Sequence, residues 1–145
     1  MTKLEEIEGV GPTYAEELRA AGVCSVEALL HAGATPRQRE ELEKKVQVGH
    51  NRILDWVNRA DLMRVRGVGE EYSDLLDKAG VDTVAELARR NPENLHAQLV
   101  EVNAARRLVR RMPSRGMVNR WVEHAANPQE LTVGSLCTYL EEVTG

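Results

Sequence analysis

The side chains best suited to bind a ligand are six arginines that lie close together in the sequence. Between Glu101 and Glu123 the chain contains no acidic residue. The arginines in that stretch are Arg106, Arg107, Arg110, Arg111, Arg115 and Arg120. A guanidinium group stays charged at physiological pH and donates paired hydrogen bonds to phosphate oxygens. The stretch is therefore a candidate surface for binding phosphate groups.

A helical interpretation of this stretch predicts which way the arginines face. We expect Asn103 to begin a separate helix that ends near Met112. At 100° per residue, the first four arginines span about 140° of such a helix, opposite its apolar side. The stretch is thus expected to form a basic, amphipathic helix with a buried apolar face. Its exposed face could bind phosphates, bind a protein, or simply be solvated or paired within the chain.

The chain contains one glycine-rich segment twice. The copies read IEGVGPTY at residues 7–14 and VRGVGEEY at residues 65–72. Matching positions differ by 58, as Gly9 and Gly67 do, and the agreement continues through the segment that follows each copy. A tryptophan segment also recurs, but Trp56 and Trp121 differ by 65, so seven residues were added to the second copy. The pattern indicates an internal duplication.

Each copy predicts a tight hairpin followed by a helix. Glycine reaches positive φ and lets the backbone turn closely, and the valine between the glycines, Val10 or Val68, is expected to enter the core. Pro12 suits the first position of the helix that follows, where its missing N–H costs nothing. Gly22 and Gly80 are expected to end these helices as left-handed C-caps.

These segments resemble the helix-hairpin-helix motif, in which the pattern h-x-h-G-h-G precedes a helix. Over about residues 4–126 the chain is also similar to an uncharacterised family described as a domain of unknown function, DUF4332; the matching segments are IEGVGP, AGATP, GVGEEYSDLL and RRNPENLH. The resemblance implies an all-α fold of two tandem helix-hairpin-helix repeats packed as one compact helical domain, with SAM-like character. It also implies contacts between hairpin amides and the phosphates of DNA or RNA.

The repeats divide the sequence into three parts. The first repeat covers residues 1–61, the second covers residues 62–126, and residues 127–145 form a tail. Ser135 is expected to begin a helix in the tail, with Leu136, Leu140 and Val143 on one stripe. No segment alternates apolar and polar residues for long enough to predict a strand. The expected fold class is therefore all-α.

The two hairpins differ in the charges around them. The residues expected to bind a phosphate backbone at the second hairpin are Arg64, Arg66, Gly67, Val68 and Gly69. The two arginines could replace the cation that DNA-binding members carry in the following helix, where this chain has Glu70 and Glu71. The first hairpin consists of Gly9, Val10 and Gly11, and several glutamates lie near it. We expect it to be a structural turn.

Several function classes are disfavoured by the sequence. Nothing approaches the roughly 18 consecutive apolar residues of a membrane span, and the absence of an apolar leader favours a cytoplasmic protein. Four histidines share no metal-ligand spacing, and Cys24 and Cys137 are expected to be reduced core thiols. There is no phosphate loop, nucleophile elbow or zinc motif, so we expect no enzyme, cofactor or metal. Lys78, beside Asp74 and Asp77, is a weak candidate for a lyase lysine.

Two functions remain open on the sequence. One is a non-catalytic module that binds DNA or RNA backbone without sequence preference, through the second hairpin and the arginine-rich helix. Its affinity would fall steeply with salt. The alternative is a protein-interaction or self-assembling module, in which the acidic first repeat of one molecule attracts the basic second repeat of another. Competition by a short duplex separates these two hypotheses.

Overall fold

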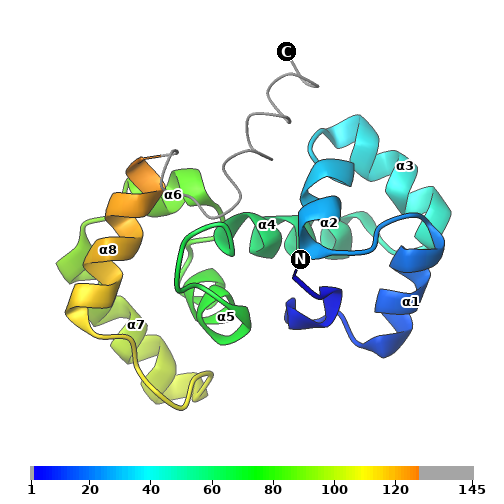
Figure 1. Ribbon diagram of the computed structural model, residues 1–145. Helices are drawn as coiled ribbons and strands as arrows, with labels where there is room; N and C mark the ends of the chain where they lie inside the picture. The colour runs from blue at the N-terminus through cyan, green and yellow to red at the C-terminus, as the bar shows by residue number, and fades with distance from the viewer. Residues whose placement is uncertain (1, 128–145) are drawn as a thin grey trace. The chain divides into compact units, whose positions relative to one another are not determined.

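The computed structural model describes residues 2–127, and within these every regular element is a helix (Figure 1). The expected all-α fold class is confirmed. The chain divides into two compact units, which within the described residues are residues 2–61, the first unit, and residues 62–127, the second unit. The helix expected at Ser135 lies outside the described residues.

The first unit begins with a single turn of 3-10 helix and continues with four α-helices. These are η1 (Leu4–Glu6), α1 (Pro12–Ala20), α2 (Val26–Ala32), α3 (Pro36–Val46) and α4 (His50–Leu62). Helix α1 contacts η1, and α2 contacts α3. The last residue of α4, Leu62, is the first residue of the second unit.

The second unit repeats this order of helices. It contains α5 (Glu70–Lys78), α6 (Val84–Ala88), α7 (Pro92–Arg106) and α8 (Arg115–Ala126). Helix α8 packs against both α6 and α7, and α5 packs against α7. By their order and their sequence, α5 to α8 are the counterparts of α1 to α4.

Most helix starts follow from local capping chemistry. Polar side chains at the N-cap accept hydrogen bonds from the first free N–H groups, which a helix cannot satisfy by itself. The capping residues with such bonds are Ser25, Thr35, Thr83, Asn91 and Ser114. Prolines occupy the first positions of α1, α3 and α7, as their sequence contexts predict.

Both glycine segments form the same tight turn. In the first glycine turn, residues 7–10, the Val10 N–H donates to the carbonyl of Ile7 at 3.0 Å, and Gly9 has φ 93°. In the second, residues 65–68, the Val68 N–H donates to the carbonyl of Val65 at 3.1 Å, and Gly67 has φ 90°. A turn with positive φ at its third position requires glycine there.

The helices after these turns end as the sequence predicts. Gly22 follows α1 with φ 91°, and Gly80 follows α5 with the same φ. The N–H of the next residue reaches back to the last turn of the helix, from Val23 to Leu18 at 2.8 Å and from Val81 to Leu76 at 2.9 Å. This six-to-one bond is the signature of a Schellman cap.

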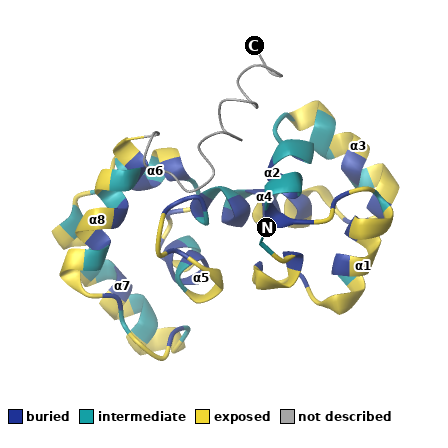
Figure 2. Ribbon diagram, in the orientation of Figure 1, coloured by how far each residue is buried: buried dark blue, intermediate teal, exposed yellow. Residues whose placement is uncertain are grey.

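One tryptophan anchors the core of each unit. Trp56 on α4 and Trp121 on α8 are each 2 % exposed. Each packs on the tyrosine of the preceding glycine segment, Tyr14 or Tyr72, with ring centroids 5.1 and 5.2 Å apart. In both units the buried residues lie on the inner faces of the helices and the exposed residues on the outer faces (Figure 2).

The expected separate helix from Asn103 to Met112 is wrong. Helix α7 instead runs without a break from Pro92 to Arg106 and ends at Arg107, which has a left-handed conformation with φ 51°. Residues 107–114, here named the arginine loop, are not helical. The side chain of Asn103 accepts a hydrogen bond from the Val109 N–H at 3.0 Å, so it closes the end of α7 instead of opening a new helix.

Candidate nucleic-acid interface

The backbone of the arginine loop is fastened to the second unit on its apolar side. Val109 is 7 % exposed and belongs to the core of this unit, and Pro113 is also buried. The Tyr72 hydroxyl donates to the carbonyl of Arg111 at 2.9 Å, and His96 Nε2 lies 3.1 Å from the carbonyl oxygen of Pro113. These contacts hold the loop in place while its charged side chains point away from the core.

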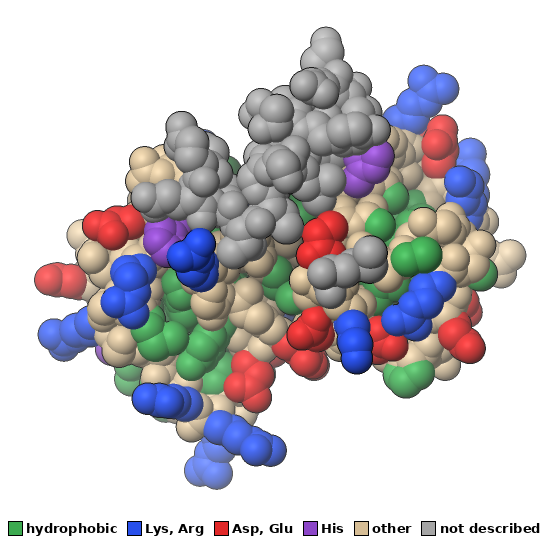
Figure 3. Space-filling model, viewed as in Figure 1, with side chains coloured by type: hydrophobic (Ala, Val, Ile, Leu, Met, Phe, Trp, Pro, Cys, Tyr) green, Lys and Arg blue, Asp and Glu red, His purple; other side chains and the backbone are tan. Residues whose placement is uncertain are grey.

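Six arginines of this region are exposed, as the sequence predicts. They are Arg106 at the end of α7, Arg107, Arg110 and Arg111 in the arginine loop, and Arg115 and Arg120 on α8. Among residues 2–127, none of their side chains makes an ion pair or hydrogen bond. Basic side chains gather over the end of α7 and the loop after it in Figure 3. Their guanidinium groups are therefore available to a ligand.

At the second glycine turn the expected binding residues separate into two groups. Gly67, Gly69 and Arg66 are exposed, whereas Val68 is 4 % exposed and fills the core. Arg64 is only 8 % exposed and is engaged in an interaction, so little of its side chain is open to a ligand. The sequence could not reveal this burial, because a charged residue directly before a turn is most often solvated.

The start of α5 does not favour an anion. Gly69 is the N-cap of this helix, and Glu70 and Glu71 occupy its first turn. Carboxylates at this position stabilise the helix dipole, but they repel a phosphate that approaches the same N–H groups. The positive charge of the second unit therefore comes from arginine side chains and not from this helix end.

Three parts of the predicted site nevertheless meet within the second unit. Tyr72, on the helix that follows the second glycine turn, is bonded to the arginine loop through Arg111. Trp121 on α8 packs against Tyr72, and its Nε1 lies 3.3 Å from the position that a Cβ on Gly67 would take. Tyr72 and Trp121 thus place the turn beside both the arginine loop and α8. We name the exposed set the arginine surface: Arg66, Arg106, Arg107, Arg110, Arg111, Arg115 and Arg120.

The arginines of the first unit are used differently. Arg39 donates to the carbonyl of Gly33 at 2.7 Å, and Arg59 donates to the carbonyl of Glu8 at 2.7 Å. Arg19 forms an ion pair with Glu5 at 2.7 Å. The hydrogen bond from this guanidinium holds the pKa of Glu5 below its usual value. These arginines stabilise the unit itself.

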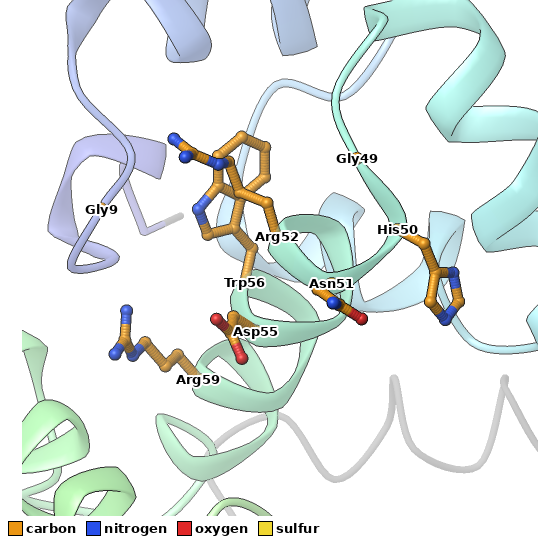
Figure 4. Close-up of a pocket in the computed structure, with 8 residues that line it drawn as sticks. All are labelled: Gly9, Gly49, His50, Asn51, Arg52, Asp55, Trp56 and Arg59. Carbon is orange, nitrogen blue, oxygen red and sulfur yellow. The ribbon is translucent and has the colours of Figure 1, made fainter.

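The first glycine turn is accompanied by a hollow that the sequence did not predict. It has a volume of about 620 Å³, and Gly9, His50, Arg52, Asp55, Trp56 and Arg59 contribute to its lining (Figure 4). Gly9 and Gly11 are exposed, and Val10 is 3 % exposed and buried in the core. The missed signal is the spacing of Arg52, Trp56 and Arg59, which places two cations on either side of a tryptophan along one helix face.

Other chemical candidates are engaged or isolated. Lys78 lies 3.7 Å from Asp74 and 3.6 Å from Asp77, so its ammonium group is paired with carboxylates. Cys24 is exposed, so the expectation that it is a core thiol is wrong, and Cys137 lies outside the described residues. Residues 2–127 contain no group of three His, Cys, Asp or Glu residues arranged to hold a metal ion. In the same range no helix has the length and apolar character needed to span a membrane.

Comparison with known proteins places the fold in a family without assigning its chemistry. The chain is 41 % identical over 56 residues to a poly(3-hydroxyalkanoate) polymerase subunit, PhaC, of Haloferax mediterranei. That similarity covers 39 % of this chain and only 10 % of the polymerase subunit. No solved structure matches the chain. The model of the family described as a domain of unknown function, DUF4332, matches residues 8–128, most of the chain, and this protein therefore belongs to the DUF4332 family.

Proposed function

We propose that this protein is a non-catalytic module that binds the phosphate backbone of nucleic acid through the arginine surface of its second unit. The observation that carries the proposal is the exposure of these arginines without a charged partner among residues 2–127. A cluster of this kind is unfavourable for the isolated protein, because like charges repel. A polyanion that released its counterions onto these arginines would relieve the repulsion.

Two features support a backbone ligand over a base-specific one. Arginines pair with phosphate oxygens irrespective of sequence, whereas reading bases requires side chains that enter a groove on a defined element. The central arginines lie in a loop that is fastened through Val109 and Tyr72, and not on a helix that could enter a groove. We therefore expect sequence-independent binding. The helix-hairpin-helix resemblance of the two glycine turns points in the same direction.

The test compares two triple variants with equal loss of charge. In Arg106→Ala/Arg110→Ala/Arg111→Ala, three exposed arginines of the second unit are removed; Arg107 is kept because its left-handed conformation closes α7. In the control, Arg37→Ala/Lys44→Ala/Lys45→Ala, three exposed basic residues of α3 are removed. Fluorescence anisotropy of labelled single-stranded and duplex DNA and RNA is measured at several salt concentrations.

The expected result is that the wild type and the control bind alike, and that the second-unit variant binds much more weakly. For duplex DNA the slope of log K against log salt should also become shallower, by about 0.9 for each phosphate that the variant no longer neutralises. Absence of binding at low salt, or an equal weakening in both variants, contradicts the proposal. Circular dichroism of both variants confirms that the helices are retained.

A protein-interaction module is the second candidate. A stretch that makes up 10 % of a polymerase subunit is 41 % identical to 56 residues of this chain. This similarity supports a module that can form part of a larger protein. Charge also permits self-association, since residues 2–61 carry a net charge of −3 and residues 62–127 a net charge of +2. Sedimentation velocity at low salt distinguishes the candidates: a self-associating module sediments faster as its concentration rises, and a short duplex that occupies the arginines dissociates it.

A further inference from the structure

A hollow lies beside the arginine surface, between α7 and the first residue of α8. It has a volume of about 460 Å³, and the residues that line it are Glu93, His96, Ala97, Val100, Glu101 and Arg115. The five that belong to α7 are spaced three and four positions apart, so they form one face of that helix. Arg115 belongs both to the hollow and to the arginine surface. A ligand that is bound by these arginines therefore lies next to the hollow.

The apolar part of the lining suits a ligand with a flat, nonpolar body. Val100 is 44 % exposed and is the one exposed residue with a large apolar side chain among residues 2–127. Single exposed apolar residues are common on protein surfaces, but this one lines a hollow that adjoins a charged surface. His96 Nε2 lies 3.1 Å from the carbonyl oxygen of Pro113, so the imidazole ring is held in place. An apolar side chain and a fixed ring together form a surface on which an aromatic ring can pack.

Two carboxylates in the lining determine what kind of group can enter. Glu93, Glu101 and Arg115 are exposed, and in the part of the chain that the structure describes none of their side chains makes an ion pair or hydrogen bond. Glu93 lies in the first turn of α7, where it also stabilises the helix dipole, but Glu101 lies in the second half of α7 and has no such role. Carboxylates repel a phosphate and accept hydrogen bonds from N–H groups. The hollow therefore suits a neutral group with N–H donors, next to an arginine that suits a phosphate.

We propose that the hollow takes one unpaired base of a single-stranded nucleic acid whose phosphates lie on the arginine surface. A base has apolar faces that can stack and N–H donors on its edge, and it is joined to a phosphate on either side. In a duplex the pairing edge is bonded to the complementary base, so only a single strand can present it to the carboxylates. Every base has an N–H group on that edge, so no sequence preference is required. The inference rests on the proposed binding of nucleic acid and adds a preference for single strands.

The first test compares three ligands of equal length by fluorescence anisotropy: a single strand, the same strand with abasic sites in place of its bases, and the duplex. Ala97→Leu fills part of the hollow without a change of charge, at an exposed position where leucine suits the helix. Ala105→Leu is the control, because Ala105 is an exposed residue of α7 outside the lining. We expect Ala97→Leu to weaken binding of the single strand by about fivefold or more, as the loss of one packed base implies. Binding of the abasic strand and the duplex should not change, and the control should bind all three ligands like the wild type.

Nuclear magnetic resonance of the Val100 methyl groups detects the base directly. The ring current of a base that packs on these groups shifts their signals, whereas a strand without bases has no such ring. Val100→Ala assigns the signals in the full chain. We expect the single strand to move them saturably and the abasic strand to move only signals of the arginine loop. Equal movement by the two strands, or a bound single strand that leaves the Val100 signals in place, overturns the proposal.

Failure of this inference can be distinguished from failure of the proposed function. If all three ligands bind and Ala97→Leu weakens none of them, the arginine surface binds phosphates and the base site is refuted. If no ligand binds at low salt, the proposed function is refuted, and uncharged nucleosides then test the hollow without the arginines. Saturable movement of the Val100 signals that Ala97→Leu prevents would support the base site. Signals that stay in place would refute it as well.

Discussion

In the first unit all five arginines contact a group of the same unit, whereas in the second unit seven arginines form an exposed surface without such contacts among residues 2–127. Both units have the same order of helices, the same glycine turn and the same tyrosine–tryptophan pair. The residues that build the frame were therefore kept in both copies, while the use of arginine diverged. Exposed charge without a structural partner is the part of the molecule most available for binding.

The divergence is concentrated where the second unit gained residues. Helix α7 has 15 residues against 11 in α3, and the connection that follows it spans residues 107–114 against residues 47–49. Both helices end in a left-handed residue, Gln47 with φ 52° and Arg107 with φ 51°. The added chain thus lengthens a helix and its exit loop and leaves the cap intact, so new side chains could appear without disturbing the core.

The prediction with the largest expected effect tests whether the two buried tryptophans contribute equally to the stability of their units. Trp56→Ala and Trp121→Ala each remove a buried indole, and each should cost about 3–5 kcal/mol of stability. Amide hydrogen exchange measures the effect unit by unit. We expect each variant to lose protection mainly in its own unit and by a similar amount. A much smaller loss for one of them would show that the two tryptophans are not equivalent.

The next prediction compares the loss of stability when a buried arginine of the first unit and an exposed arginine of the second unit are replaced. Arg59→Met removes the bond to the Glu8 carbonyl from a site that is 8 % exposed, and should destabilise the first unit by about 1–3 kcal/mol. The matched change Arg110→Met, on the exposed arginine surface, should alter stability by less than about 0.5 kcal/mol. Urea unfolding of both variants provides the comparison. Equal destabilisation would remove the distinction between structural and exposed arginines.

The glycine turns give a third comparison, within one turn. Gly67→Ala places a side chain at φ 90° and brings its Cβ to 3.3 Å from Trp121 Nε1, so it should cost about 1–3 kcal/mol. Gly69→Ala is the control, because this residue has φ −110° and open space around its Cβ position. Thermal unfolding should separate the two variants clearly. Similar melting temperatures would show that the turn tolerates a side chain at its third position.

The smallest effect is a pH dependence of the stability of the first unit, which comes from Glu27. Burial by itself raises the pKa of Glu27, but hydrogen bonds from Thr2 and from the backbone outweigh it, so the pKa lies below the usual 4.5. The resulting stability is present above pH 4.5 and is lost as the pH falls through the folded-state pKa. Glu27→Gln should remove less than about 1 kcal/mol at neutral pH, because the group is partly solvated.

The matching position of the second unit holds Ala85, so this contribution has no counterpart there. Unfolding curves of the wild type and Glu27→Gln at several pH values measure the effect. The two proteins should differ in stability at neutral pH and converge once the pH falls below the folded-state pKa of Glu27, which itself lies below 4.5. A difference that persists at low pH would assign the effect to packing of Glu27 and not to its charge.

The sequence alone determined the local structure of this protein. Glycines permit the positive φ that the backbone adopts at Gly67 and at the helix end at Gly80. Capping residues mark the starts of most helices. Such features depend on a few neighbouring residues, so a duplicated sequence forms the same turn and helix in each copy. The exposure of the arginine cluster also followed from composition, since so many charges in one stretch cannot all be buried.

Only the tertiary structure decided how these pieces are used. The apolar residues around Val109 fit a helix as well as a loop, and the loop prevails because Asn103 caps α7 and Tyr72 binds the backbone of Arg111. The close approach of Gly9 to Trp56 and Arg59 on α4 likewise depends on contacts between residues distant in sequence. Local propensity cannot encode such contacts, because they form only when separate helices pack together.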